Sequence, residues 1–588
     1  MDNIKTTLIS ELKNAFIKKY QFDIGIQYFS VIYVGNHGID YSMRSLFALQ
    51  KYLGTINIDT TCQELFNDLT CDLNKIYYDI AFDKNFININ LKTSHICNLM
   101  INAFDNDIIP NIPNKKKILV DFSSPNIAKD MHVGHLRSTI IGDSICKLYE
   151  FQGHEIYRIN HVGDFGLQFG MIIQHLLEKY PNYYNCDFSI ADLQLFYAES
   201  KKRFDTDEIF KKNAYQKVVQ LQSGKIAIVE AWNFIKEISQ RSYNEIYNRL
   251  DIVITECGES FYQNKIPSLI EELELKNIII IEDGRKVIKV DKYELPLTIV
   301  KSDGGFTYDT TDLAAVRYRL VELNMDKIVY VVDNGQSLHF ELIFKVAEMM
   351  GWKKEHQELK HVGFGLVCGA DGKKFKSRSG DTVKLIDLLD NSLIEASKIF
   401  KQNNDEVVFT EIDKIRDNMS NNEKQTIIKN VAYGSIKYAD LATMRTNNYN
   451  FSFQKMLSLK GNTGSYQLYE YVRICAILRN ANNHINDLDS KTFNVSEKEE
   501  HNICKLILIF PEIIDRLSND LMFHNLCGYL YDLTNTFSIF HKKCRCLQYN
   551  ENKVLIHANH NRLLICIATK KILEKCFCIL GINKLERM

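Results

Sequence analysis

The sequence lacks an excess of either charge. Its 588 residues hold 72 Lys and Arg against 73 Asp and Glu, which leaves a formal net charge of −1. A chain without a global positive field is not drawn to nucleic acid by its overall charge. The balance is uneven, because residues 421–588 hold 22 Lys and Arg against 15 Asp and Glu, a net charge of +7. We therefore expect a polyanion to bind in the C-terminal part, if anywhere.

Further absences narrow the class of protein. Although there are 15 cysteines, no C-x-x-C pair occurs, and Cys544-Arg-Cys546 and Cys576-Phe-Cys578 have the wrong spacing for structural zinc. We expect no resident metal, and we interpret the cysteines as reduced thiols packed as small apolar groups. No apolar run approaches the roughly 18 residues that span a bilayer, and the first residues lack the apolar core of a signal peptide. The sequence thus predicts no membrane contact.

The most informative stretch runs from Val120 to Gly170. It opens in an apolar run, 118–120, that is typical of a buried strand, and a polar loop follows in which Pro125 disfavours helix at the preceding residue. A segment with helical spacing, 136–151, leads to a second strand at 155–159. Strand, loop, helix and strand form the first unit of an open parallel sheet, whose ligands bind beyond the carboxyl ends of the strands. No G-x-G-x-x-G follows the first strand, which argues against a dinucleotide-dependent oxidoreductase.

The motif His132-Val-Gly-His135 lies where the first helix begins. Its two histidines are three residues apart and so share nearly one helical face. They could donate to phosphate oxygens beside the unpaired N–H groups of the helix N-terminus, and Gly134 would let a flat base lie against the backbone. Taken alone, the same four residues could also be a helix cap with two exposed polar rings.

The surrounding residues favour the phosphate-binding interpretation. Three segments resemble the signature of class I aminoacyl-tRNA synthetases, and within them the arginyl-tRNA synthetases: Phe122-Ser-Ser-Pro-Asn-Ile-Ala-Lys129, Leu136-Arg-Ser-Thr-Ile-Ile-Gly-Asp143 and His161-Val-Gly-Asp-Phe-Gly-Leu-Gln-Phe-Gly170. The resemblance covers most of the chain and includes Leu585-Glu-Arg-Met588 at its end. It implies ATP-dependent activation of L-arginine to arginyl-adenylate and transfer to the 3′ end of tRNA(Arg), with Mg²⁺ assisting.

Three domains are expected on the combined grounds of pattern and resemblance. Residues 1–112 would form an N-terminal α+β domain that contacts the tRNA elbow. Residues 113–410 would form a doubly wound, Rossmann-like parallel-sheet α/β catalytic domain, interrupted by a helical, charged insertion at about 181–276. Residues 411–588 would form an all-α anticodon-binding domain.

The resemblance also assigns residues to ATP and to catalysis. Catalysis falls to Lys129, His132, His135 and Lys374, and ATP binding to His132, Gly134, His135, Val362, Phe364, Lys374, Lys376 and Ser377. The loop after an expected strand at His361–Val367 would be a cationic phosphate clamp, although by composition it is also typical of a solvated basic turn. It reads Lys374-Phe-Lys-Ser-Arg378 where the family usually has Lys-Met-Ser-Lys-Ser, so the roles of Lys376 and Arg378 stay open. Lys129 occupies the place of a lysine thought to compensate for this divergence.

An arginine pocket is implied by a second group of residues. The set comprises Ser124, Asn126, Glu259, Tyr308, Asp312 and Gln336. Tyr308 and Asp312 are four residues apart on an expected helix and share a face, where a carboxylate beside a phenol suits the planar fork of a guanidinium. By themselves, Asp312 could merely favour a helix N-terminus and Glu259 could be a solvated loop residue. His339 could cap a helix or contact ATP.

Tyr466, Tyr469 and Met588 are the residues that the resemblance assigns to tRNA. Unstacked bases stack well on aromatic rings, but two tyrosines at this spacing are also typical of a helical core. The resemblance implies that tRNA(Arg) must be bound before arginine is activated. The divergent loop offers a physical reason, since its phosphate clamp would be poorly set without tRNA.

Two rival interpretations are weaker. A cysteinyl-tRNA synthetase would need a cluster of zinc-ligand cysteines, which this sequence lacks, and it would not carry the Glu259, Tyr308 and Asp312 set. A catalytically silent tRNA-binding paralogue would not need an intact His132-Val-Gly-His135. We expect a cytoplasmic enzyme whose partners are tRNA(Arg), L-arginine and ATP. Whether it is a monomer or a homodimer stays open.

Overall fold

The computed structural model describes residues 3–21, 23, 25, 29–36, 39–43, 67, 78–83, 86–106, 114–369, 383–402 and 419–587. The chain divides into two compact units. The first comprises Asn114–Ser458 with Ile579–Ile582, and the second comprises Met1–Pro113, Leu459–Cys578 and Asn583–Met588.

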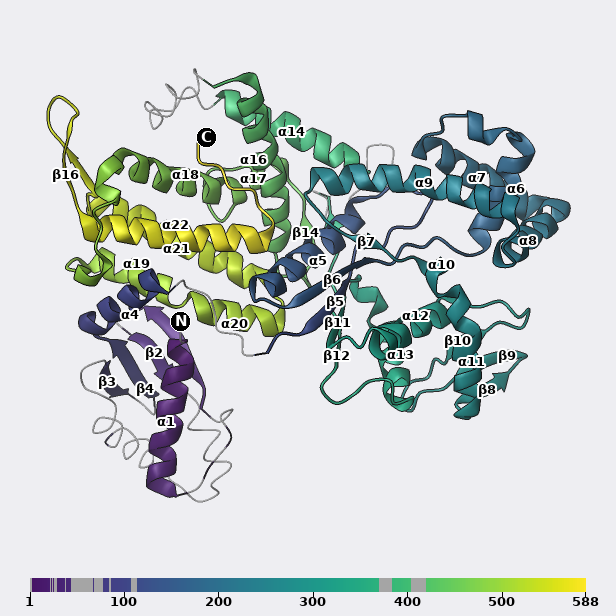
Figure 1. Ribbon diagram of the computed structural model, residues 1–588, viewed down its shortest axis with the longest axis horizontal. Helices are drawn as coiled ribbons and strands as arrows, with labels where there is room; N and C mark the ends of the chain where they lie inside the picture. The colour runs from purple at the N-terminus through teal and green to yellow at the C-terminus, as the bar shows by residue number, and fades with distance from the viewer. Residues whose placement is uncertain are drawn as a thin grey trace. The chain divides into compact units, whose positions relative to one another are not determined.

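A five-stranded parallel sheet forms the centre of the first unit (Figure 1). Its spatial order is β12 (Glu358–His361), β11 (Lys327–Tyr330), β5 (Lys117–Asp121), β6 (Glu155–Asn160) and β7 (Thr255–Glu256). Residues 118–121 of β5 are buried, as expected for a parallel strand covered on both faces. The chain leaves β5 toward β6 and later returns on the other side at β11, so the strand order reverses beside β5. Ligands bind at such a switch point, and the predicted doubly wound fold is confirmed.

Most of the crossover between β6 and β7 consists of helices. They are α6 (Leu167–Lys179), α7 (Ile190–Thr206), α8 (Glu208–Gln222) and α9 (Ile226–Arg249). Figure 1 shows them gathered at one end of this unit, away from the strands β8 and β9. The sheet resumes with β7 at Thr255, so residues 255–276, which we expected within the insertion, begin with a strand of the catalytic sheet.

The second half of the unit adds a small antiparallel sheet and further helices. These are α10 (Glu259–Tyr262), α11 (Ile266–Leu275), β8 (Ile279–Glu282), β9 (Arg285–Ile288), β10 (Leu297–Val300), α12 (Tyr308–Arg317) and α13 (Ser337–Met349). A π-helical turn, Tyr318–Glu322, continues α12 and carries the buried Arg319. The strand expected at His361–Val367 is displaced, because β12 ends at His361 and pairs along the sheet edge, where polar residues are tolerated.

Two later helices pack on α5 (Val133–Phe151), the helix that begins at the histidine motif. They are α14 (Leu385–Gln402) and α16 (Asn421–Leu441). The unit then continues through β14 (Tyr449–Asn450), which pairs with β13 (Val367–Cys368), and α17 (Phe453–Met456). It therefore reaches Ser458, past the boundary that we expected at residue 410.

A buried ion pair joins α5 to α16. The Arg137 Nε donates to Asp440 Oδ1 at 2.9 Å, and both side chains are almost completely buried. The same guanidinium donates to the carbonyls of Gly365 and Asn447, each at 2.9 Å. One cation thus ties the histidine helix to three other segments of the unit.

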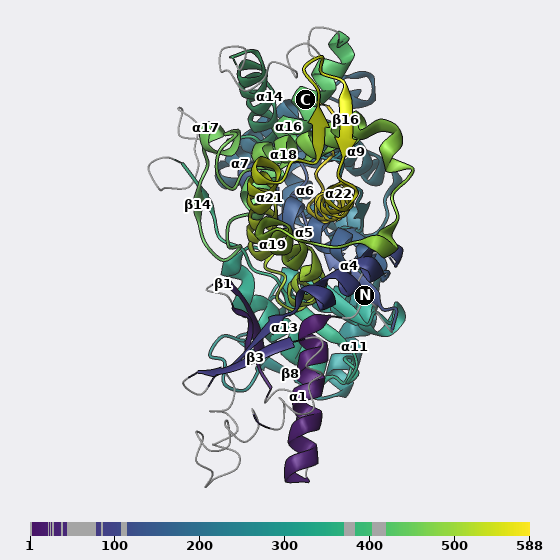
Figure 2. The ribbon, with the colours of Figure 1, turned by 90° about the vertical axis from the view of Figure 1, so that its left-hand side faces the viewer.

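The second unit combines the N-terminal strands with the C-terminal helices. Its antiparallel sheet has the order β1 (Val31–Asn36), β2 (Ile39–Met43), β4 (Phe86–Leu91) and β3 (Tyr78–Asp83), with α1 (Ile4–Tyr20) beside it in Figure 2 and α4 (Thr93–Asp105) following it. The later elements are α18 (Gly464–Ala481), α19 (Lys498–Leu508), α20 (Phe510–Asp520), α21 (Phe523–Lys543), β15 (Leu547–Tyr549), β16 (Leu555–Ala558) and α22 (His560–Leu580). Tyr41 donates to Glu512 at 2.6 Å, and Lys505 pairs with Asp40 at 2.7 Å. The N-terminal module thus packs on the C-terminal helices. In the described part of the chain, the helices are all too short or too polar to cross a membrane.

Asp440→Asn should lower the free energy of unfolding of the first unit by about 3–5 kcal/mol, because it leaves the Arg137 cation buried and uncompensated. The chain's two tryptophans, Trp232 and Trp352, both lie in this unit, so their fluorescence during urea unfolding reports its stability. Asp283→Asn, at an exposed pair with Arg285, is the control and should cost less than about 1 kcal/mol. A loss below about 1 kcal/mol for Asp440→Asn would contradict the assignment.

Candidate active site

The histidine motif caps its own helix. The His132 Nδ1 accepts from the backbone N–H of Gly134 at 3.0 Å, and the His135 Nδ1 accepts from the backbone N–H of His132 at 3.1 Å. A Cβ on residue 134 would lie 2.7 Å from the His132 ring, so a side chain there would displace that ring from its capping position. Because each Nδ1 accepts, each neutral ring carries its proton on Nε2, which is thereby a donor. Both expectations for this motif, the cap and the donor pair, are compatible with this geometry.

The loop between β5 and α5 has a strained backbone. Ser123, Ser124 and Ala128 have φ of +72°, +45° and +61°, a region that residues with a side chain rarely adopt. Such residues cost on the order of 1–3 kcal/mol each and persist only where the surroundings hold them. The N–H of Ser123 donates to Ser138 Oγ of α5 at 2.8 Å, and that of Ser124 donates to Asn160 Oδ1 at the end of β6 at 2.9 Å. The loop that carries Ser124, Asn126 and Lys129 is therefore tightly fixed.

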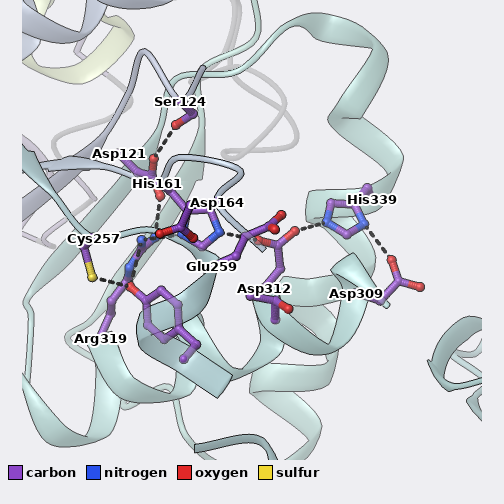
Figure 3. Close-up of polar contacts among 12 residues, drawn as sticks. Asp121, Ser124, His161, Asp164, Cys257, Glu259, Asp309, Asp312, Arg319 and His339 are labelled. Carbon is purple, nitrogen blue, oxygen red and sulfur yellow. Dashed lines mark hydrogen bonds and ion pairs between the residues drawn. The ribbon is translucent and has the colours of Figure 1, made fainter. Parts of the chain in front are cut away.

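A buried arginine links this loop to the opposite side of the pocket, as Figure 3 shows. Arg319 pairs with Asp121 at 2.7 Å, and Asp121 accepts from the Ser124 hydroxyl at 3.2 Å. The other end of the guanidinium lies 3.5 Å from His161 Nδ1, and the His161 Nε2 lies 3.8 Å from Asp312. Sequence reasoning missed Arg319, because nothing in a helical pattern marks one arginine as the partner of a strand-end aspartate.

Glu259 occupies the first position of α10, in a mostly buried site. Burial, together with the negative charges of Asp312 and Asp164, raises the pKa of Glu259 to about 8. Asp164 is itself fully buried and is held by the N–H and hydroxyl of Ser260, at 2.8 Å and 2.7 Å, and by Lys236 at 3.0 Å. Near neutral pH the Glu259 carboxyl is therefore largely protonated until a cation arrives.

Asp312 faces Glu259 in Figure 3 and is bound from the other side by His339. The His339 Nε2 lies 2.7 Å from Asp312 Oδ2, and its Nδ1 lies 3.3 Å from Asp309. Burial alone would lower the pKa of His339, but the two carboxylates outweigh it and raise that pKa to about 9. His339 is thus an imidazolium held between two aspartates, a role that neither alternative from the sequence described.

The remaining arginine-pocket candidates come from three different segments. Tyr308, the first residue of α12, is 65% exposed, and its ring centroid lies 5.2 Å from that of His339. Asn126 forms a β-bridge with Gly163, and Gln336 is an exposed residue in a short 3₁₀ helix that follows β11. An open cleft extends from Glu259 and Tyr308 toward the insertion helices.

The ATP candidates divide into three groups. Lys129 lies beside the histidine motif, with its ammonium 5.0 Å from the centroid of the Tyr197 ring on α7. Val362 and Phe364 are buried, so any contact with ATP would come mainly from their backbone. Lys374, Lys376, Ser377 and Arg378 lie outside the described residues, as does Met588.

The structure does describe residues 383–385, which follow the divergent loop. Val383 accepts from the N–H of Val133 at 3.2 Å, and the N–H of Leu385 donates to the carbonyl of Met131 at 2.8 Å. Lys384 pairs with Asp130 at 2.6 Å. Residues 383–385 therefore lie directly beside the histidine motif.

The tyrosines assigned to tRNA lie in α18 of the second unit and are half-buried. Arg473 donates to the Tyr469 hydroxyl at 2.8 Å and lies over the same ring, 4.8 Å from its centroid. Tyr466 packs edge-on against Tyr531, with 5.9 Å between ring centroids. Both rings have protein partners, so their part in tRNA binding stays a prediction.

Replacing His339 should change how stability depends on pH. Its pKa is raised from 6.5 to about 9 by folding, so its contribution is fully present below pH 6.5 and is lost as pH rises through 9. As the pH rises from 6.5 to 9, the free energy of unfolding should fall in the wild type and fall less in His339→Gln. The difference between the two falls should reach about 3 kcal/mol. Tryptophan-monitored urea unfolding at pH 6.5 and 9 measures this. His356→Gln, at an exposed histidine, should keep the wild-type slope, and a wild-type slope in His339→Gln would contradict the pairing.

Known protein families match the chain in two places. The family described as tRNA synthetases class I (R), catalytic domain, matches residues 95–453, and the DALR anticodon binding domain matches residues 467–588. A curated relative, the cytoplasmic arginine–tRNA ligase of Bos taurus, is 47% identical over 510 residues, which is 86% of this chain and 76% of the relative. The cytoplasmic enzyme of Xenopus tropicalis is 45% identical over 93% of this chain and 83% of its own length.

Solved structures agree with this match. The crystal structure of arginyl-tRNA synthetase from Plasmodium falciparum aligns over 100% of both chains with a TM-score of 0.87 and 32% identity. The Thermus thermophilus arginyl-tRNA synthetase, at 19% identity and a TM-score of 0.78, shares the fold. Since the catalytic-domain family spans more than half of the sequence and the relatives align over most of it, the chain belongs to the class I arginyl-tRNA synthetases.

Proposed function

We propose that this chain activates L-arginine with ATP and transfers it to the 3′ end of tRNA(Arg), with both steps at the carboxyl edge of the parallel sheet. The observation that carries the proposal is the pair of carboxylates, Glu259 and Asp312, held near the sheet's switch point and the histidine-capped helix. In the first step the arginine carboxylate attacks the α-phosphate of ATP and pyrophosphate leaves. In the second, a terminal ribose hydroxyl of tRNA attacks the adenylate carbonyl and AMP leaves. Neither step needs a protein nucleophile, so positioning and charge stabilisation supply the catalysis.

ATP would bind along the start of α5. The Nε2–H groups of His132 and His135 would donate to phosphate oxygens, beside the N-terminal N–H groups of the helix. The missing side chain of Gly134 would let the adenine lie close to the backbone. Lys129 would neutralise the leaving pyrophosphate together with Lys374.

Mg²⁺ is proposed as a companion of ATP. Across the part of the chain that the structure describes, no group of three or more His, Cys, Asp or Glu is arranged to hold a metal. The donors offered here are imidazole and ammonium groups, which suit phosphate oxygens better than Mg²⁺. The ion would therefore be held mainly by the phosphates, and when bound it would offset their charge.

The arginine side chain would enter between Glu259 and Asp312. A guanidinium offers five N–H donors in a plane, which two carboxylates and the Tyr308 phenol can share. Ser124, Asn126 and Gln336 would orient the α-amino and carboxylate groups. Since a cation favours the ionised form of Glu259, arginine binding would lower the pKa of that carboxyl.

tRNA(Arg) is proposed to bind through the second unit, whose segment after Leu459 holds the DALR match. Tyr466, Tyr469 and Met588 are our candidates for its anticodon contacts, and the N-terminal domain is our candidate for the tRNA elbow. Like the relatives named as cytoplasmic, the enzyme is assigned to the cytoplasm.

The variant His132→Asn distinguishes the role of His132 as a helix cap from its proposed role in catalysis. Asparagine is a good N-cap, so this variant should keep the helix stable, whereas His132→Ala should cost about 1 kcal/mol. Both should slow adenylate formation about a hundredfold or more, because neither keeps the Nε2–H donor. Pyrophosphate exchange with tRNA(Arg) present and tryptophan-monitored unfolding give the two readouts. A wild-type exchange rate in His132→Asn would remove this histidine from the reaction.

Labelled pyrophosphate should exchange into ATP only when arginine and tRNA(Arg) are both present. The physical reason is that tRNA would favour a competent arrangement of the divergent Lys374-Phe-Lys-Ser-Arg378 loop, if it binds that arrangement better. The protein must first be freed of RNA with nuclease and high salt. Robust exchange without tRNA would mean that Lys129 and Lys374 suffice alone, whereas no exchange with any amino acid would oppose the proposed function itself.

A further inference from the structure

One face of the insertion helix α9 carries a continuous row of polar contacts to the catalytic fold. Trp232, Lys236, Ser239, Tyr243 and Tyr247 follow one another at steps of three or four residues, and so lie on a single stripe of the helix. The hydrogen bonds and ion pairs of this stripe reach the loop after β5, Asp164, and the ends of β6 and β7 at Asn160 and Glu256. A helix that only filled space in an insertion would present apolar side chains along this face.

The C-terminal part of the stripe, which begins at Ser239, holds the strained loop. The Ser239 hydroxyl accepts from the N–H of Ala128 at 3.0 Å, at the residue whose φ is +61°. The buried Tyr243 hydroxyl donates to the carbonyl of Asn126 at 2.5 Å and lies 3.2 Å from that of Lys129. Together with the β-bridge between Asn126 and Gly163, these hydrogen bonds from α9 fix the backbone of the three loop residues.

Tyr247 completes the contact one turn further along. Its hydroxyl lies 2.8 Å from Ser123 Oγ and accepts from Asn160 Nδ2 at 3.1 Å. Asn160 in turn accepts from the N–H of Ser124. Each of the three residues with positive φ is thus reached by α9, directly or through one intermediate.

The N-terminal part of the stripe, Trp232 and Lys236, holds the other side of the pocket. The Trp232 Nε1 donates to the carbonyl of Asp164 at 2.8 Å, and the Lys236 Nζ donates to the Asp164 carboxylate at 3.0 Å. Asp164 binds the N–H and hydroxyl of Ser260, the residue after Glu259. The same helix therefore touches the supports of both Asn126 and Glu259.

We propose that α9 is a positioning element for arginine activation, in which Tyr243 and Ser239 hold the main chain of Asn126–Lys129 in the conformation that presents Asn126 to arginine and Lys129 to the phosphates. This inference rests on the proposed function and adds residues that need not touch substrate or ATP. The far end of the helix offers a matched control, because the Tyr433 hydroxyl accepts from Arg249 Nε at 2.8 Å, away from the loop.

The test compares Tyr243→Phe and Ser239→Ala with Tyr433→Phe. Each substitution removes one hydroxyl from a largely buried site on or against α9 and keeps the rest of the side chain. The kcat and the KM for arginine are measured in aminoacylation of tRNA(Arg), at a temperature well below each melting temperature. Loss of the loop contacts should lower kcat/KM for arginine about tenfold or more, with a raised KM, in the first two variants. Tyr433→Phe should stay within about twofold of the wild type.

The outcomes separate cleanly. A structural role alone would lower melting temperatures and leave the KM for arginine of the folded enzyme unchanged in all three variants, which would overturn the inference. Equal losses in Tyr433→Phe would also overturn it, since that hydroxyl does not face the loop. Failure of the wild type to charge arginine would instead refute the proposed function, which the inference requires.

Discussion

The constraint on which the rest of the pocket depends is the placement of two carboxylates, Glu259 and Asp312, close together and mostly out of water. Burial, and after it the negative charge of Asp312, oppose the ionisation of Glu259 and raise its pKa to about 8. His339 compensates Asp312 from the side away from Glu259, where it is shared with Asp309. One carboxylate is thus paired with a cation, while the other lacks a cationic partner among the described contacts. A guanidinium is the ligand that removes this imbalance.

Holding these groups requires supports that lie outside the pocket. The buried Arg319 connects Asp121 at the end of β5 with His161 beside Asp312, so both walls share one cation. Asp164 is bound by Lys236 and Ser260, which fixes the start of α10. The strained loop after β5 has no regular secondary structure of its own, so side chains from α5, β6 and α9 hold it. The parallel sheet places the segments, and these polar contacts then orient the side chains.

Local pattern was enough to predict the elements that place the site. The apolar run of β5, the polar loop and the helix at His132 follow from short-range rules, whereas the switch point is known only from the strand order in the structure. Resemblance to a family supplied Glu259, Tyr308 and Asp312, whose spacing alone did not distinguish a pocket from a helix start. The structure adds that Asp312 faces Glu259 and that His339 lies between two aspartates.

Other features depend on long-range packing that a sequence pattern does not encode. The pairing of Arg137 with Asp440 joins residues 303 apart and keeps α16 with the catalytic sheet. The row from Trp232 to Tyr247 is visible in the sequence as helical spacing, but its targets 68 to 124 residues away are not. Likewise, nothing in the order of residues shows that Val383 and Leu385 bond to Val133 and Met131.

Calorimetry of arginine binding tests the central claim, that Glu259 and Asp312 await a cation, most directly. Arginine is titrated into the enzyme without ATP at pH 7.5, in buffers that differ in their heat of ionisation, so that the protons released are counted. If the pKa of Glu259 is about 8 and a guanidinium lowers it well below neutral, about 0.8 proton should be released per arginine. Glu259→Gln should abolish that release, and the neutral isostere citrulline should not cause it. Arginine binding with no proton release, or with the same release in Glu259→Gln, would contradict the account.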